Sequence, residues 1–324
     1  MITARSIAAA VAIALLSSVL ALPAFAQDTP TLLVLRPKPK ARDQSSGLKV
    51  APVVQSDVVE IKIGGKPAII TAWTPLLNGP TTLQLVVLID SQERIGVGNQ
   101  FDDIRNLFAS LPSNVEIAVG YMLHGKTEIA QPFTTDRVLA GNALRPMTEE
   151  AEAVSSKNDD GSPYRCLHDL SVNWPNPDPK KVRAVLMFTS GIPHDINGFG
   201  DLKDPPLLDL EVEMASEDLI GAGIAPFSVF YIDPVPRKGR PRQSGPGSLG
   251  QLVQATNGQN LWDPPNVSFS PELYRFFSIL YSEAVVTVAA KGSGLKGLDI
   301  QSTSDDLNVV GPQEVMIGNE LPKK

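Results

Sequence analysis

Two long, mostly apolar segments constrain the fold of this chain more than any other feature. They are LQLVVLID, residues 83–90, and VRAVLMFTSG, residues 182–191. A strand with one face in water alternates apolar and polar residues, whereas a strand covered on both faces by helices is apolar throughout. We therefore expect both segments to form interior strands of a parallel sheet.

The segments around these strands have the spacing of helices and further strands. Residues 99–111 place apolar side chains three and four positions apart, with acids in the first half, as in an amphipathic helix. Ser162 and Pro163 are a good cap and first-turn pair for a helix over 162–174. Further helices are expected at 136–144, 205–223, 249–258 and 270–283, and further strands at 115–123, 127–133, 224–233 and 259–262. The alternation predicts a doubly wound α/β domain with a mostly parallel central sheet and helices on both faces.

The flanks of this α/β domain, residues 81–283, have a different character. Residues 27–52 contain RPKPKARDQSSG, which has Pro and charge but no apolar period, and we expect a flexible linker there. Residues 53–80 alternate on both sides of a Gly-Gly pair, as a β-hairpin does. Residues 284–324 are β-rich. The two flanks are expected to form a small β-rich extension of the domain.

The first 26 residues have the features of a secretory signal peptide. An apolar run follows Arg5, and Ala24-Phe25-Ala26 supplies the small residues of a cleavage site. A transmembrane anchor fits less well because the run is short. No Cys follows the run, so a lipid anchor is not indicated. We expect a secreted or periplasmic protein with no integral membrane segment after signal cleavage.

Charge and cysteine content exclude two classes of protein. Loss of Arg5 with the signal peptide leaves 27 basic and 35 acidic residues, a formal net charge of −8. An acidic chain with no basic stripe is a poor match for nucleic acid. Cys166 is the single cysteine, so an internal disulfide is excluded, and it is expected to be a small buried apolar residue.

The stretch GYMLHGKT, residues 120–127, fits the written pattern of an ATP-binding P-loop. A P-loop lysine stands at the start of a helix, but here Gly120 lies inside an expected strand and Pro132 disfavours a helix after Lys126. We therefore expect two strands joined at His124-Gly125, and no ATP site. The stretch GVGNQF is expected to be a Gly-rich loop before a helix.

No complete catalytic constellation is visible. His124, His168 and His194 are too scattered for a helical zinc pair, and no Gly-x-Ser-x-Gly elbow is present. One alternative stays open, an extracytoplasmic hydrolase or other enzyme that uses Asp90, His168 or His194 in an arrangement hidden by sequence separation. A nucleophile within hydrogen-bond reach of a base would distinguish the enzyme.

An ordered set of segments over residues 53–318 resembles the von Willebrand factor type A domain, in particular the secreted type A-related proteins of acidobacteria. The segments are LVVLIDSQER, VEIAVGYML, AQPFTTD, GSPYRCLHDL, RAVLMFTSG and APFSVFYI. The resemblance implies a ligand face at the carboxyl ends of the strands. In type A domains that face usually holds a divalent cation on Asp-x-Ser-x-Ser, a Thr, and the Asp of Thr-Asp-Gly.

This chain departs from that pattern, so the resemblance implies a degenerate metal-ion-dependent adhesion site. Asp90 keeps its place, Gln92 and Arg94 replace the two serines, Ser162 stands where the Thr would be, and Ser190 replaces the second Asp. Two unit charges 4 Å apart repel by roughly 4 kcal/mol at an effective dielectric of 20, and a divalent ion doubles this. Arg94 should therefore exclude Mg²⁺ and either pair with Asp90 or point to solvent. No metal and no cofactor are expected.

The leading hypothesis is a secreted, non-enzymatic protein-binding module of the adhesion type. Its partner surface is expected at four loops that follow sheet strands, residues 91–99, 157–163, 190–206 and 233–248. The last loop is basic and could receive an acidic partner protein. Its charged residues are Arg237, Lys238, Arg240 and Arg242.

Overall fold

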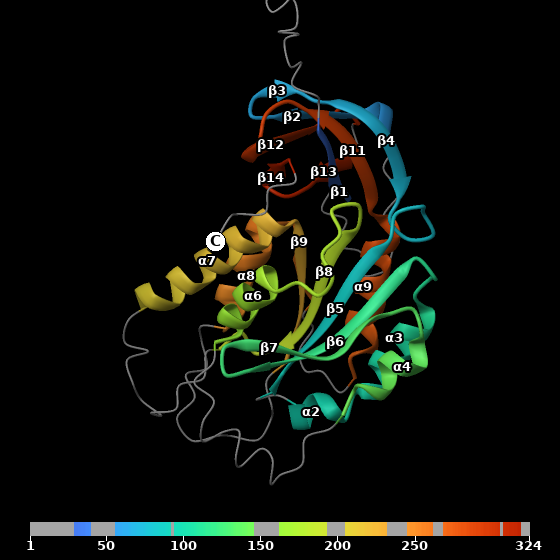
Figure 1. Cartoon of the computed structure of the whole chain (residues 1–324), viewed down its shortest axis with the longest axis vertical. Helices are drawn as coiled ribbons and strands as arrows, with labels where there is room; N and C mark the ends of the chain where they lie inside the picture. Colours follow the sequence, from blue (N-terminus) through green and yellow to red (C-terminus); the bar gives the residue numbers. More distant parts are fainter. Residues whose placement is uncertain are drawn as a thin grey trace, which may run out of the picture.

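A six-stranded sheet lies at the centre of the protein, as Figure 1 shows. The structure is a computed structural model of the 324-residue chain. It describes residues 29–39, 56–91, 94–145, 162–192, 205–231, 245–261, 268–304 and 307–318. The strand order is β10-β9-β8-β5-β6-β7, and every neighbouring pair is parallel except β6 and β7. The bounds are β5 (Leu83–Asp90), β6 (Val115–Leu123), β7 (Lys126–Thr134), β8 (Val182–Thr189), β9 (Ile224–Phe230) and β10 (Gln259–Leu261). The mostly parallel sheet predicted from the sequence is confirmed.

The two apolar segments form the adjacent central strands β5 and β8. All eight residues of each strand are buried. They pair in parallel register, with Leu85 opposite Ala184 and Ile89 opposite Phe188. Successive side chains of a strand point to opposite faces, so burial of every residue requires cover on both sides.

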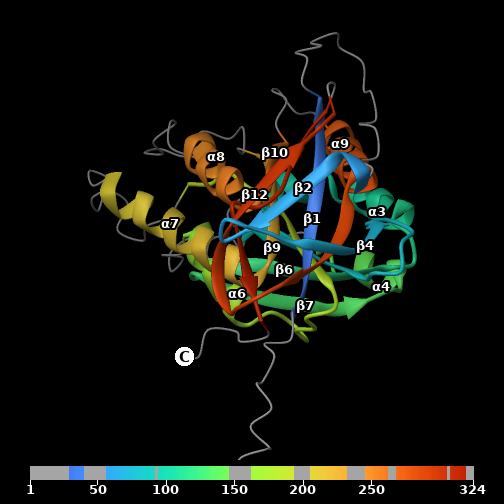
Figure 2. The same cartoon turned by 90° about the horizontal axis from the view of Figure 1, so that it is seen from above.

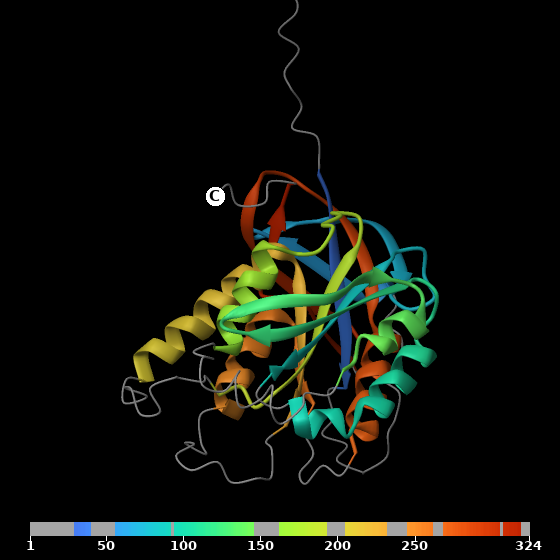
Figure 3. The same ribbon diagram turned by 60° about the horizontal axis from the view of Figure 1, so that its bottom comes forward.

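Helices supply that cover on both faces of the sheet (Figures 1 and 3). Leu85 and Val87 belong to the core on one face, and Val86 and Leu88 to the core on the other. The first core is closed by α3 (Phe101–Ser110), α4 (Arg137–Asn142) and α9 (Ser270–Ser282), and the second by α6 (Pro163–Val172), α7 (Pro205–Ala222) and α8 (Gly245–Thr256). None of the described helices is both long and apolar enough to cross a membrane.

The stretch that matches the P-loop pattern is a hairpin. β6 and β7 pair in antiparallel fashion, with Leu123 opposite Lys126. His124 and Gly125 form the turn, with φ of 52° and 69°. Lys126 begins a strand and not a helix, so the phosphate-binding geometry of a P-loop is absent from this stretch.

The flanking segments build more than a small hairpin layer: they form two four-stranded sheets that share an apolar core (Figure 2). One sheet has the order β13-β1-β11-β4 and the other β14-β12-β2-β3. The bounds are β1 (Thr29–Pro39), β2 (Val59–Ile63), β3 (Lys66–Pro67), β4 (Ile69–Pro75), β11 (Ala284–Ala290), β12 (Gly294–Ser302), β13 (Leu307–Val310) and β14 (Glu314–Ile317), with a short 3-10 helix at Ser56–Val58 before β2.

The predicted hairpin around Gly64 and Gly65 is confirmed for its first part only. β2 and β3 pair across these glycines, whose φ values are 56° and 77°. Two consecutive positive φ values suit a tight hairpin turn, and glycine adopts them at no steric cost. The chain then leaves this sheet, because β4 pairs with β11 in the other one.

The prediction of a flexible linker over residues 27–52 is wrong for residues 29–39. These residues are β1, which pairs with β11 along one edge and with β13 along the other. Leu33 and Leu35 enter the core shared by the two four-stranded sheets, while Leu32 and Val34 pack against the α/β core. The alternation of buried faces determines the structure of this segment, even though its last four residues are the Pro and charged residues of RPKP.

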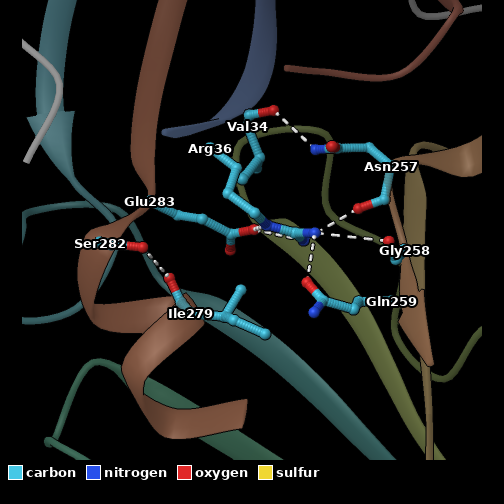
Figure 4. A network of polar contacts seen from close by, with 8 residues as sticks. All are labelled: Val34, Arg36, Asn257, Gly258, Gln259, Ile279, Ser282 and Glu283. Atoms are coloured by element: carbon cyan, nitrogen blue, oxygen red, sulfur yellow. Dashed lines mark hydrogen bonds and ion pairs between the residues drawn. The ribbon is translucent and has the colours of Figure 1, made fainter. Parts of the chain in front are cut away.

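A buried ion pair joins β1 to the α/β domain (Figure 4). The Nε and Nη2 atoms of Arg36 donate to Glu283 Oε1 at 2.8 and 2.7 Å. Nη2 also donates to the carbonyl oxygen of Asn257 at 2.9 Å, and Nη1 to those of Gly258 at 3.4 Å and the Gln259 side chain at 3.3 Å. Burial raises the pKa of Glu283, and the Arg36 charge opposes that effect.

Candidate functional site

The sheet has a topological switch point between β5 and β8. The chain proceeds from β5 to its neighbour β6 on one side, and later returns to β8 on the other side. In open parallel sheets, ligands bind at the carboxyl ends of the strands next to such a point. Asp90 ends β5 and Thr189 ends β8. Asp90, the first residue of the site predicted from the sequence, therefore lies at the switch point, where ligands bind in sheets of this kind.

Asp90 and Thr189 contact each other directly. Thr189 Oγ1 donates to Asp90 Oδ2 at 2.7 Å and accepts a hydrogen bond from the backbone amide of Gly191 at 3.0 Å. Asp90 is 3% exposed and Thr189 is fully buried. The Asp90 carboxylate is thus held by a neighbouring strand. Thr189 was not among the site residues predicted from the sequence.

Ser190, the residue in place of the second carboxylate, is buried at the same end of the sheet. It is 0% exposed, and its hydroxyl oxygen has no hydrogen-bond partner in the described part of the chain. Gly191 follows with φ of 66°, a conformation that favours glycine. A buried hydroxyl without a partner is uncommon and costs free energy. The loop of Ser190 is therefore a candidate binding position.

Ser162 has a structural role at the same end of the sheet. Its side chain accepts a hydrogen bond from the Tyr164 amide at 3.2 Å and caps α6. The Tyr164 hydroxyl donates to the carbonyl oxygen of Gly191 at 3.0 Å, and burial raises the pKa of Tyr164 far above its usual range. Tyr164 thereby connects α6 to the loop of Ser190, and this contact was not predicted from the sequence.

A short helix, α2 (Arg94–Gly98), lies at the carboxyl ends of the strands (Figures 1 and 3). The predicted Gly-rich loop is therefore partly helical. A Cβ atom added at Gly96 would lie 2.0 Å from the hydroxyl oxygen of Tyr231, which follows β9. Tyr231 donates its amide to the carbonyl oxygen of Thr189 at 3.1 Å. Gly96 thus permits a close contact between α2 and the neighbouring strand ends.

Several predicted site residues fall outside the part of the chain that the structure describes. They are Gln92, the side chain of Arg94 and the basic-loop residues Arg237, Lys238, Arg240 and Arg242. Large parts of the four predicted loops, and the signal peptide, also lie outside it. The pairing of Arg94 with Asp90 stays a prediction.

At the positions of the type A pattern, the described residues supply the carboxylate of Asp90 and the hydroxyls of Ser162 and Ser190. Mg²⁺ needs several oxygen ligands in near-octahedral geometry, usually with more than one carboxylate or a phosphate. Asp90 is the carboxylate at this position, and the hydroxyl of Thr189 already donates to it. The described residues include no group of three or more His, Cys, Asp or Glu side chains that suits a metal.

The histidine side chains do not assemble a catalytic site among the described residues. His168 Nδ1 lies 2.5 Å from Asp218 Oδ2, and this pair connects α6 to α7 on the surface. Ser171 donates to the backbone carbonyl of His168 and not to its ring. His124 occupies the turn between β6 and β7. His194 lies outside the described residues.

Comparison with known proteins gives structural likeness without a family assignment. No family model and no curated protein matches the sequence. The VWA domain of SpRpn10 is 10% identical, with a TM-score of 0.36 over 60% of this chain and 95% of that one. The pilus adhesin SpaC from Lactobacillus rhamnosus GG is 11% identical, with a TM-score of 0.38 over 70% of this chain and 34% of that one. The N-terminal domain of TFIIH p34 is 10% identical, with a TM-score of 0.36 over 61% and 97%. At these TM-scores the likeness decides neither family nor function, and the fold rests on the strand order and register.

Proposed function

We propose that the protein is an extracytoplasmic, non-enzymatic protein-binding module related to the type A domains, and that it binds its partner without a divalent cation. The binding surface comprises α2 and the loops at the carboxyl ends of the central sheet. The contact between Asp90 and Thr189 at the switch point is the observation that supports this most directly. Asp90, the residue that matches the adhesion motif, is the last residue of the fully buried strand β5. Rigid strands of this kind support binding loops well.

The cation-free mode follows from the charges at this position. Asp90 is satisfied in part by an internal hydroxyl, and Ser190 supplies no second negative charge. Arg94, at the first position of α2, adds a permanent positive charge four residues after Asp90. We propose that this guanidinium takes the electrostatic role that the cation has in type A domains.

Calorimetry on the mature protein tests the cation-free mode. The protein is stripped with a chelator and titrated with Mg²⁺ and with Mn²⁺. We expect no stoichiometric isotherm at micromolar affinity, because one carboxylate is a weak site for a dication. A stoichiometric isotherm that disappears in Asp90→Ala would show the proposal to be wrong.

The binding surface is tested with a pull-down from the envelope fraction of the native organism. Gly96→Val forces either α2 or the Tyr231 ring to move, because even a Cβ atom at this position overlaps the Tyr231 hydroxyl and ring. Gly250→Val on α8 is the matched control, since a Cβ atom there meets nothing within 4 Å. We expect Gly96→Val to lose at least ~10-fold in partner recovery relative to the control. Equal recovery by both variants would remove this surface from the proposal.

The enzyme alternative is distinguished by its nucleophile. Among the described residues, the ring of His168 contacts Asp218 and no hydroxyl or thiol. An activity found in the mature protein and abolished by His168→Ala or by His194→Ala would favour the enzyme.

A further inference from the structure

A cavity of about 270 Å³ lies at the opposite end of the parallel sheet from Asp90. It is bounded by the first residues of β8 and β9, the last turn of α7, and strands β1 and β14. Arg183 in the cavity and Thr189 at the ligand face are six residues apart on β8, which corresponds to about 20 Å. The cavity is therefore separate from the proposed protein-binding surface. Its walls are largely apolar and include Leu219, Ile220, Ala222, Val315 and Met316.

Arg183 brings a cation into this apolar cavity. The residue is 7% exposed, yet its one hydrogen bond to the described protein is from Nη1 to the carbonyl oxygen of Ala222 at 3.2 Å. Its guanidinium carbon lies 5.9 Å from the centroid of the Trp174 ring. Burial lowers the pKa of Arg183 and Asp178 raises it, and an arginine so placed stays charged.

Most N–H groups of Arg183 have no acceptor within the described residues. A guanidinium has five N–H donors, and leaving such donors without acceptors in a desolvated place costs free energy. None of the Arg183 nitrogens is both sealed from solvent and without a partner, so the unused donors still reach solvent at the cavity. An incoming anion could meet them there.

Two other charged side chains border the cavity. The Lys181 Nζ atom binds both carboxylate oxygens of Glu116, at 2.8 and 2.9 Å, so its charge is already offset. Glu314, on β14, is half-buried and lines the cavity. Its carboxylate disfavours an anion, but a half-buried glutamate can turn its head group toward water and away from the guanidinium of Arg183.

We propose that this cavity binds a small apolar molecule with a carboxylate group. The carboxylate pairs with the guanidinium of Arg183, whose planar fork suits two parallel N–H···O bonds, and the apolar part lies against α7 and β14. The proposal goes beyond protein binding at the other end of the sheet, and neither depends on the other.

Calorimetric titration of the mature protein with octanoate tests this site, with 1-octanol and octylamine as probes of the same chain length. We expect saturable one-to-one binding of octanoate, and at least ~10-fold weaker binding of both comparison probes, because they lack the negative charge. Arg183→Met should weaken octanoate binding at least ~10-fold and leave the weak affinity for 1-octanol unchanged. Glu314→Gln should strengthen octanoate binding, since it removes a like charge.

A second variant keeps the test informative if Arg183→Met does not fold. Gly221 lies in the last turn of α7 and lines the cavity, and a Cβ atom there meets nothing within 4 Å. Gly221→Phe should fill the cavity and abolish octanoate binding without a lower Tm. Gly250→Phe on α8, also with open space around its Cβ, is the matched control and should bind octanoate as the unmodified protein does.

Each outcome either supports the proposed carboxylate site or overturns it. The proposal is overturned by an absence of saturable octanoate binding, by binding that survives both Arg183→Met and Gly221→Phe, or by 1-octanol binding as tightly as octanoate. A free acid and the carboxyl terminus of a peptide share this chemistry. A short acetylated peptide ending in leucine with a free carboxylate distinguishes them: tighter binding than octanoate, with the same Arg183 dependence, assigns the site to a chain terminus.

Discussion

Arg36 and Glu283 are 247 positions apart in the sequence, yet they form a buried ion pair at 2.7 Å. Each residue stands at a boundary, Arg36 near the end of β1 and Glu283 between α9 and β11. Backbone carbonyl groups at residues 257 and 258 complete the shell around the guanidinium (Figure 4). At the residue scale, buried charges of this kind determine how the flanks are attached to the α/β domain.

Removal of Arg36 should strongly destabilise the protein. Arg36→Met leaves the Glu283 carboxylate buried without its counter-charge, which typically costs about 3–5 kcal/mol. The double variant Arg36→Met with Glu283→Leu removes both charges and should recover most of that loss. Urea unfolding of the three proteins measures the difference. A single variant as stable as the unmodified protein would show that the pair has no net effect.

Asp103 should make stability depend on pH in the acid range. It accepts hydrogen bonds from Ser268 and Ser270 hydroxyls at 2.8 Å and from the Phe269 amide at 2.9 Å, at the start of α9. Partial burial alone would raise the pKa of Asp103, but these hydrogen bonds outweigh it and lower the pKa below 3.8. A carboxyl group with a lowered folded pKa stabilises above its unfolded pKa, and this contribution is lost as pH falls through the folded value.

Asp103→Asn should therefore cost about 1–2 kcal/mol near pH 7, as loss of a good cap does, and the difference should shrink below about pH 4. Unfolding in urea at a series of pH values measures it. Asp102→Asn is the control, because that carboxylate is largely exposed and pairs with Arg105 within the same helix. A difference between the Asp103 variant and the unmodified protein that stayed constant down to pH 2 would contradict this assignment.

At the element scale, close approach of backbone segments sets the positions of short elements. β10 has three residues, and the chain enters it from α8 through Gly258. A Cβ atom at Gly258 would lie 1.9 Å from the carbonyl oxygen of Pro226 in β9. The obstructing atom belongs to backbone, which cannot rotate away as a side chain can. Glycine is therefore required at this position for β10 to pair with β9.

Gly258→Ala should destabilise the protein by about 1–3 kcal/mol, the usual cost of forcing extra volume into a packed region. Gly250→Ala is the matched control within α8, where a Cβ atom meets nothing and alanine should stabilise by up to ~1 kcal/mol. Thermal unfolding followed by circular dichroism measures both changes. Equal Tm values for the two variants would contradict the role assigned to Gly258.

At the scale of the whole molecule, β1 holds the two cores together. Its side chains alternate between the core of the four-stranded sheets and the α/β core, and its two edges pair with β11 and β13. The view in Figure 2 shows β1 running beneath β2 and across the central strands. The strand lies between the two parts of the fold, so neither core is closed without it.

A chain that begins at residue 53 should consequently fail to fold stably. Full burial of Leu33 and Leu35 alone contributes about 3–6 kcal/mol, which is comparable to the total stability of many domains. A chain that begins at residue 27 is the control and should melt cooperatively. Addition of a synthetic peptide of residues 27–41 to the shorter chain should restore cooperative melting. An unchanged Tm for the shorter chain would disprove this role of β1.

Elements with a local signal could be predicted from the amino-acid sequence. The mostly apolar runs at 83–90 and at 182–189 predict strands that are covered on both faces, and Ser162-Pro163 starts a helix through its own side-chain and ring geometry. The turn at His124-Gly125 follows from the alternation on either side of it. Asp90 was assigned to the site through the resemblance to the type A pattern, in which an Asp follows the first strand.

Features that depend on residues far apart in the chain could not be predicted from local patterns. β1 was mistaken for linker because its pairing partners lie beyond residue 283, and Arg36 is a core residue only because Glu283 lies opposite it. The contact of Thr189 with Asp90 arises where strands 99 positions apart become neighbours, and the cavity at Arg183 arises where β8 and β9 meet β1, β14 and α7. Periodicity reports which face of an element is buried, but not which distant segment buries it.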